Sequence, residues 1–187
     1  MPEFLTPIRA SPLAAIAKPG RFGSRRETLG VELSVLHPAS IVTVIARKGC
    51  TEQLAAAVAA LKDCTVYWAG FEQYYVITKN RSDLALYRKL TDRLNSIATL
   101  SDQSHGRIMI RIAGSKARQT LAKGTPVDLD PAEFAVGKSV LTQMSHVVVH
   151  LTRTGEDAFE VSLFRGFAES FWEWLTRQAG EFGYHVT

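Results

Sequence analysis

Short segments with strand or helix periodicity alternate along this chain in an order that occurs twice. In the first half the pattern predicts strands at VELSVLH (31–37) and IVTVIAR (41–47), a helix capped by Thr51 at TEQLAAAVAALK (51–62), a hairpin over 65–78, and a helix at SDLALYRKLTDRLNSI (82–97). Leu84, Tyr87, Leu90 and Leu94 mark the expected buried side of the second helix. This half has the order ββαββα.

The second half follows a similar order, ββαβββα. Strands are predicted at IATLS (97–101), RIMIRIA (107–113), SVLTQM (139–144), HVVVHLTR (146–153) and AFEVSLF (158–164), with a short helix at 114–124 capped by Ser115 and a capped turn at DPAEF (130–134). We therefore predict an α+β fold made of two β-rich subdomains, 27–97 and 98–187, with helices packed on mainly antiparallel sheets.

Residues 1–26 hold four of the seven prolines and no hydrophobic period, so we expect an extended arm. It is either a frayed terminus or a segment that lies along a partner. Apolar and basic side chains favour the partner, and the predicted contacts are Phe4, Ile8, Arg9, Leu13 and Ile16. The arm carries five basic residues and one acidic residue, whereas the remaining 161 residues hold 17 of each sign. This distribution argues against nucleic-acid binding by the folded body.

Trp172 and Trp174 lie two residues apart in the predicted C-terminal helix FAESFWEWLTRQAGEFG (167–183). On a helix their side chains point about 160° apart, so one core stripe does not receive both. The predicted core side consists of Phe167, Phe171, Trp174, Leu175, Gln178 and Phe182. Trp172 is buried either by the chain's own arm or sheet edge or by a neighbouring subunit, and we predict a partner contact because Trp is enriched at interface hot spots.

No group of side chains predicts catalysis, a cofactor or a metal. His146 and His150 flank three valines that favour a strand, where the two rings stand about 13 Å apart, too far for one ion. Gly114 precedes a helix but lacks the other glycines of a phosphate loop. Cys50 and Cys64 show no metal or redox spacing, which indicates reduced thiols and a cytoplasmic location. The longest apolar run, 54–61, is too short to span a membrane.

Three segments resemble the gamma subunit family of bacterial heterotetrameric sarcosine oxidase: AFEVSLFRGFAESFWEWLTRQAGEFG (158–183), RIMIRIAGSKARQTLAKGTPVDLDPAEF (107–134) and SPLA (11–14). FAESFWEWL together with the upstream DAFE (157–160) is the specific part. The resemblance runs from about Ser11 to Gly183. Relatives often read KGCPLDLHP where this chain has KGTPVDLDP (123–131).

The resemblance implies a non-catalytic, structural subunit that assembles with alpha, beta and delta subunits. The complex oxidises sarcosine to glycine with oxygen and yields hydrogen peroxide and methylene-tetrahydrofolate. Its FAD, FMN, NAD, tetrahydrofolate and zinc are implied to lie in the other subunits, with none on this chain. The implied fold is similar to the folate-binding domain of the glycine-cleavage aminomethyltransferase, two β-rich halves with swapped strands. The alternatives are an independent folate-binding one-carbon transferase and an RNA-binding module that uses the basic arm.

Overall fold

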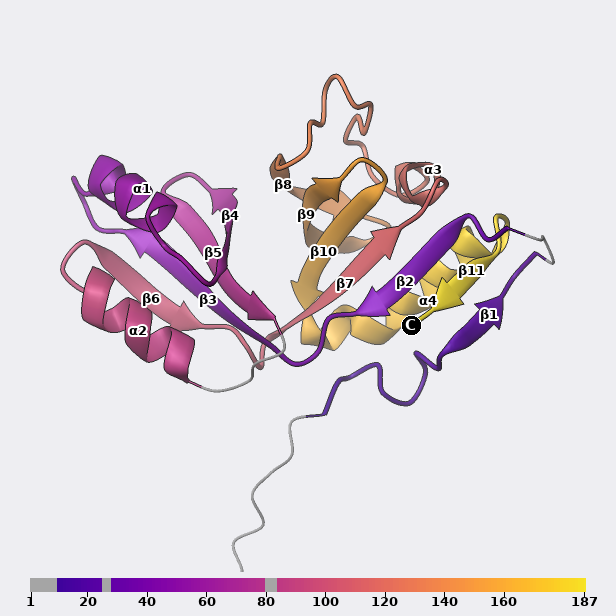
Figure 1. Cartoon of the computed structure of the whole chain (residues 1–187), viewed down its shortest axis with the longest axis horizontal. Coiled ribbons are helices and arrows are strands. Elements are labelled where there is room, and N and C mark those ends of the chain that lie inside the picture. Colours follow the sequence, from indigo (N-terminus) through magenta and orange to yellow (C-terminus); the bar gives the residue numbers. More distant parts are fainter. Residues whose placement is uncertain (1–9, 25–27, 80–83) are drawn as a thin grey trace, which may run out of the picture.

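The computed structural model describes residues 10–24, 28–79 and 84–187, which form two sheets with helices on their outer faces (Figure 1). The strands are β1 (Gly20–Phe22), β2 (Val31–Val35), β3 (Ala39–Ala46), β4 (Thr65–Gly70), β5 (Gln73–Lys79), β6 (Ala98–Asp102), β7 (Arg107–Ala113), β8 (Ser139–Met144), β9 (Val147–Gly155), β10 (Ala158–Phe164) and β11 (Tyr184–Val186). The helices are α1 (Thr51–Ala59), α2 (Ala85–Leu94), α3 (Ala117–Ala122) and α4 (Ala168–Gly180), with a 3₁₀ turn, η1 (Arg165–Phe167), before α4. The α+β class and the predicted helix and strand segments are confirmed.

The smaller sheet has four strands in the order β4-β5-β3-β6, and each neighbouring pair is antiparallel. Its chain order, β3-α1-β4-β5-α2-β6, is the split βαβ arrangement of ferredoxin-like folds. Residues of β3 and β5 pack under α1 and α2 in one core cluster, made of Val42, Val44, Leu54, Val58, Val76, Leu86, Leu90, Leu94 and Ala98. The helices cover only one face of this sheet, and its other face meets the larger sheet.

The larger sheet has seven strands in the order β1-β11-β2-β7-β10-β9-β8. β2 pairs with β7 in antiparallel register, with Leu33 opposite Ile112, although the whole four-stranded sheet lies between them in the sequence. The smaller sheet is thus a contiguous insertion, and Figure 1 shows the two chain segments that connect it to the rest. A single cut after residue 97 does not separate the sheets, because β2 belongs to the larger sheet and β6 to the smaller one.

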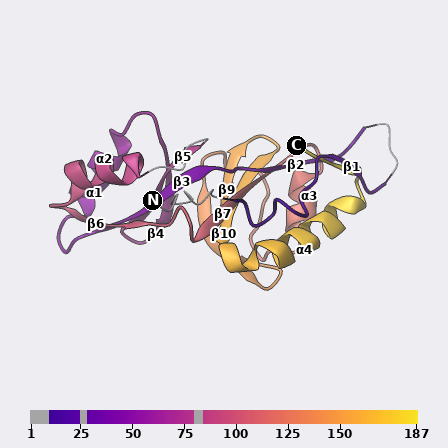
Figure 2. The same cartoon turned by 90° about the horizontal axis from the view of Figure 1, so that it is seen from below.

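Helices α3 and α4 lie with the seven-stranded sheet, away from α1 and α2 (Figure 2). The strand alternation places Phe159, Val161 and Leu163 of β10 in the core cluster shared with α4. On α4 the buried side chains are Ala168, Phe171, Trp172, Leu175 and Ala179, spaced as one helical stripe. None of the helices in the described part of the chain has the length and apolar character needed to cross a membrane.

The described residues of the N-terminal segment, 10–24, are part of this fold. Leu13, inside a turn, is fully buried in the core cluster of the larger sheet. β1 then pairs with β11, and the Ser24 amide donates to the carbonyl of Gly180 at 2.8 Å. The described part of residues 1–26 therefore packs on its own chain, which corrects the prediction of an extended arm. Local periodicity missed this docking because β1 has only three residues.

The helix starts also differ from the predicted caps. Cys50 precedes α1 and Lys116 precedes α3, and neither cap side chain accepts a hydrogen bond from its helix. Thr51 instead bonds through its hydroxyl to Glu72 in the turn between β4 and β5. On α2, Leu86 takes the buried place expected for Leu84, which is exposed. The capped turn at Asp130 is confirmed, because its carboxylate accepts the amide of Ala132 at 2.9 Å.

Candidate functional site

A buried polar cluster fills the junction between the two sheets. Alternation along β10 points Glu160 and Ser162 away from the α4 core, toward the uncovered face of the smaller sheet. That face contributes an apolar layer made of Ala39, Ile41, Tyr67, Ala69, Tyr75 and Ile77, which packs with Met109 of β7. We call these polar and aromatic side chains at the sheet contact the junction cluster: Tyr67, Tyr75, Lys79, Arg107, His150, Glu160 and Ser162.

Glu160 is the anion of the junction cluster and is 3% exposed. Its carboxylate accepts a 2.8 Å hydrogen bond from the Tyr67 hydroxyl and is paired with the ammonium group of Lys79. Burial, together with the neighbouring Glu160 charge, raises the pKa of Tyr67, so the phenol stays protonated and donates. Both donors come from the smaller sheet, whereas the acceptor comes from the larger one, so these bonds hold the two sheets together.

His150 joins the sheets at a second point. Its side chain is 1% exposed, and Nε2 lies 2.7 Å from the carbonyl oxygen of Trp68 on the edge strand β4. A carbonyl only accepts, so Nε2 carries the proton and Nδ1 is the basic nitrogen. The Tyr75 ring meets the imidazole edge-on at 5.1 Å, and the Tyr67 ring stacks at 6.0 Å. Burial lowers the pKa of His150, and the charge of Arg107 lowers it further against the opposing effect of the Trp68 bond.

Arg107 supplies the cation next to His150. Its guanidinium carbon lies 4.8 Å from the Tyr75 ring centre and 4.4 Å from that of Phe164, so the group is held between two aromatic faces. Nη1 also donates to the Ser162 hydroxyl at 3.4 Å. Arg107 and Phe164 come from the larger sheet and Tyr75 from the smaller one. The charged groups of the junction are therefore bonded to one another or stacked on rings.

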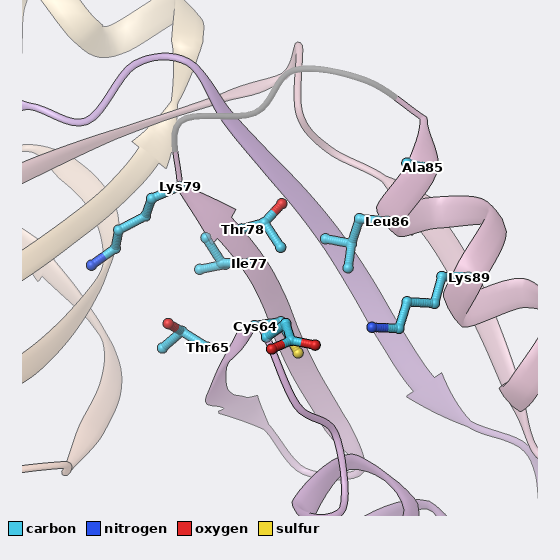
Figure 3. Close-up of a pocket in the computed structure, with 9 residues that line it drawn as sticks. Cys64, Thr65, Ile77, Thr78, Lys79, Ala85, Leu86 and Lys89 are labelled. Carbon is cyan, nitrogen blue, oxygen red and sulfur yellow. The ribbon is translucent and has the colours of Figure 1, made fainter.

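A surface cavity of about 690 Å³ lies on the smaller sheet between β4, β5 and α2 (Figure 3). Figure 3 shows the ammonium group of Lys89 pointing toward Cys64 and that of Lys79 pointing away from it. Burial raises the pKa of the Cys64 thiol, although Lys89 acts in the opposite direction. A thiol whose pKa is raised has little thiolate at neutral pH, so this cavity does not activate Cys64 as a nucleophile.

The predicted partner contacts fall into three groups. Leu13, at 0% exposed, and Trp172, at 4%, are buried in the same core cluster of this chain, which corrects the prediction that a partner covers them. Ile16 is 42% exposed and is available to a partner. The other three, Phe4, Ile8 and Arg9, lie outside the described residues. The buried stripe of α4 therefore includes Trp172, whose side chain lies in the same core cluster of the larger sheet as Leu13.

Trp174 lies on the flank of α4 and is only partly buried. Its ring packs 5.6 Å from Phe171 and covers Gly124, where an added Cβ would lie 2.2 Å from Trp174 Cζ2. The predicted core residue Phe167 is exposed. The alanines at 168 and 179 are the sequence signal for which side of α4 is buried, because they lie on the same side of the helix as Phe171, Trp172 and Leu175.

The remaining sequence candidates do not form a ligand site. His146 is exposed in the turn before β9, while His150 points into the junction. At the start of α3 the Lys116 amide donates to Gly30 and the Ala117 amide to Gly114, so the backbone itself uses these donors. Across residues 10–24, 28–79 and 84–187 no group of three or more His, Cys, Asp or Glu side chains could hold a metal ion.

The two-sheet architecture of this chain has a counterpart among solved structures. It is similar to glycine cleavage system aminomethyltransferase T from Bartonella henselae, with 17% identity, a TM-score of 0.61, and 82% of this chain and 49% of that one covered. That likeness shows a shared fold.

The family follows from the sequence. The model of the sarcosine oxidase, gamma subunit family matches residues 31–181, so the chain belongs to this family. Sarcosine oxidase subunit gamma from Corynebacterium sp. (strain P-1) is 27% identical over 136 residues, and the match spans 72% of this chain and 66% of that relative's length. A chain of heterotetrameric sarcosine oxidase from Corynebacterium sp. U-96, solved in complex with pyrrole 2-carboxylate, is 25% identical, with a TM-score of 0.76. That comparison covers 93% of this chain and 96% of the other.

Proposed function

We propose that this chain is a non-catalytic gamma subunit of a heterotetrameric sarcosine oxidase, with a structural role in assembly. The observation that carries the proposal is the match to a chain of that oxidase over nearly the full length of both chains. The junction cluster supports the absence of a catalytic role, because Glu160 and His150 are used in bonds that join the two sheets. Their side chains hold the subunit's shape.

In this proposal the partners are the alpha, beta and delta subunits, and the complex oxidises sarcosine to glycine. FAD, FMN, NAD, tetrahydrofolate and zinc are proposed to bind in those subunits. Exposed apolar side chains provide surface for such contacts, and Phe71 at the β4–β5 turn, 86% exposed, is the most exposed of the large ones described. Aromatic residues, Phe among them, are enriched in the buried core of protein–protein interfaces.

Co-expression tests the proposal. The chain is produced with the alpha, beta and delta subunits from the same source, and the mixture is separated by size exclusion. We expect the chain to elute with the other three, and a preparation without it to give less assembled complex. The isolated chain is expected to be colourless, to leave sarcosine unoxidised, and to release no heat when titrated with tetrahydrofolate. Elution of the chain alone while the other subunits assemble normally contradicts the assembly role, and micromolar tetrahydrofolate binding favours the one-carbon transferase.

A further inference from the structure

The two sheets end in edge strands, and the outer edge of the smaller sheet is left without a neighbour in the described part of the chain. β4 and β6 are the edges of the smaller sheet, and β1 and β8 are those of the larger one. β4 lies against β8, and β1 has only three residues. β6 has five residues, lies outermost in the smaller sheet (Figure 1), and pairs with β3 alone among the described strands.

The hydrogen bonds at the two ends of β6 show which way its backbone groups point. Just before the strand, the Arg47 amide donates to the Ile97 carbonyl at 2.8 Å. Just after it, the Gln103 amide donates to the Ile41 carbonyl, also at 2.8 Å. In an antiparallel ladder, residue pairs that exchange hydrogen bonds alternate with pairs that do not. Ile97 and Gln103 are an even number of residues apart, so both ends of the strand give the same alternation.

This alternation divides the backbone of β6 into inward and outward groups. Thr99 and Ser101 direct their amides and carbonyls at β3. Ala98, Leu100 and Asp102 direct theirs away from the sheet. Among the described residues, no hydrogen bond reaches the amide or the carbonyl of Leu100, at the middle of the strand. The outer side of β6 therefore presents backbone donors and acceptors that await a partner.

The sequence of β6 does not protect this edge. Natural edge strands are kept from pairing by lysine, by proline, by a β-bulge or by a covering segment. The β6 sequence ATLSD contains neither lysine nor proline, and its register with β3 is unbroken from Ala98 to Asp102. Thr99, Ser101 and Asp102 are exposed. An edge with these properties is a template for a further strand.

The chemistry of the edge defines what it binds. Outward amides and carbonyls at every second residue are matched by an extended backbone, which adds to the sheet as a new strand. The two ends of the edge also differ in charge. Exposed Arg47 and Lys48 lie where β6 begins, with Arg47 Nε donating to the Asn95 carbonyl at 3.1 Å, whereas Asp102 is the last residue of the strand. An extended segment that is acidic at the first end and basic at the second complements both.

We propose that β6 is a strand-addition edge: an extended segment of another subunit pairs with it and continues the smaller sheet beyond its four strands. The inference rests on the proposed function, because in that complex the alpha, beta and delta subunits are the chains that supply the segment. The added backbone bonds the amide and carbonyl of Leu100. Its side chains meet Thr99 and Ser101 on the face away from α2, where Ile45, opposite Thr99 and 41% exposed, adds apolar contact.

Hydrogen exchange tests the pairing one amide at a time. The complex co-expressed from the four subunits and the isolated full-length chain are placed in deuterated buffer at the same pH, and uptake is resolved to single residues along β6. We expect the Leu100 amide to exchange at least about tenfold more slowly in the complex than in the isolated chain. The amides of Thr99 and Ser101, which bond to β3, are the internal controls and should be slow in both samples. A Leu100 amide that exchanges equally fast in both samples overturns the strand addition.

Leu100→Pro and Leu100→Ala separate the backbone bond from the side chain. Both variants lose the packing of Leu100 against the core under α2, but only proline removes the amide donor. Proline is tolerated at an edge position whose amide points away from the sheet. In size exclusion of the co-expressed complex, we expect Leu100→Pro to bind about tenfold more weakly than Leu100→Ala. Equal retention of the two variants contradicts the proposal. If circular dichroism shows that the proline variant does not fold, exchange in the unaltered chain decides.

The outcomes separate this inference from the proposed function. A chain that does not enter the complex refutes the proposed function, and the strand addition with it. A chain that enters the complex while its Leu100 amide stays unprotected refutes the strand addition alone. Protection of that amide in the isolated chain that rises with its concentration shows that a second copy covers the edge, which overturns the assignment to another subunit.

Discussion

Leu13→Ala measures how much the N-terminal segment contributes to the core. The Leu13 side chain is fully buried in the cluster that contains Trp172. Replacing it with alanine removes three carbon groups from the core, which costs about 2.4 kcal/mol at roughly 0.8 kcal/mol for each methylene equivalent. The cavity left behind raises the expected loss of unfolding free energy to about 3 to 5 kcal/mol. For a chain of this length that loss lowers the melting temperature by roughly 6 to 20 °C.

Equilibrium urea denaturation at neutral pH, followed by tryptophan fluorescence and circular dichroism together, gives the unfolding free energy. Ile16→Ala is the matched control, since Ile16 lies three residues away in the same segment but is half exposed. We expect that control to stay within about 1 kcal/mol of the unaltered chain. If Leu13→Ala also stays within that range, or if both variants lose the same amount, the N-terminal segment is not part of the core.

Two further substitutions probe contacts that the sequence does not reveal. Gly124→Ala forces a methyl group against the Trp174 ring and should destabilise the chain by about 1 to 3 kcal/mol, a loss that Trp174→Leu in the same chain should largely reverse in thermal melts. Tyr67→Phe leaves a buried Glu160 oxygen without its donor and should lower the free energy of unfolding, measured by urea denaturation, by about 1 to 3 kcal/mol. Tyr74→Phe, on the helix face of the same sheet, is the control and should cost less. Equal losses in the two variants would contradict the role assigned to the bond between Tyr67 and Glu160.

Strand positions could be predicted from local sequence because the β-branched run of β3 favours a strand, and the structure buries its residues 39–44 on both faces. Which strands pair with one another could not be predicted from the local sequence. β2 has the same alternation whether it pairs with β3 next to it in the sequence or with β7 far away, and only the folded chain selects β7. The predicted boundary after residue 97 rested on sequence order, which an inserted unit does not respect.

The junction cluster was missed for a related reason. Glu160 alternates with apolar residues in AFEVSLF, which predicts a polar side chain on the outer face of a strand. Nothing in that pattern shows that a second sheet covers this face. Trp172 illustrates the opposite error, because a helical wheel ranked the larger apolar residues and gave no weight to Ala168 and Ala179, which fix the phase of the buried stripe.

The inserted unit, residues 39–102, is contiguous in sequence. If it is excised from the chain, the face of its sheet that packs on the larger sheet becomes exposed to solvent. Its helices protect one face of the sheet, while Ile41, Tyr75 and Ile77 on the other face are buried only in the cluster that includes Met109 of the larger sheet. Each such side chain contributes about 1.5 to 3 kcal/mol by burial, so excision forfeits about 5 to 9 kcal/mol. A single small core supplies roughly 3 to 5 kcal/mol.

We therefore expect the excised 39–102 segment to lack a stable fold, despite its complete ferredoxin-like topology. Circular dichroism melts of the segment and of the full chain, recorded at the same concentration, make the comparison. The segment should show no cooperative transition, whereas the full chain should. A sharp transition of the segment near that of the full chain would mean that the junction adds little stability. In that case the two sheets are separate domains, and the polar bonds between them set only their relative position.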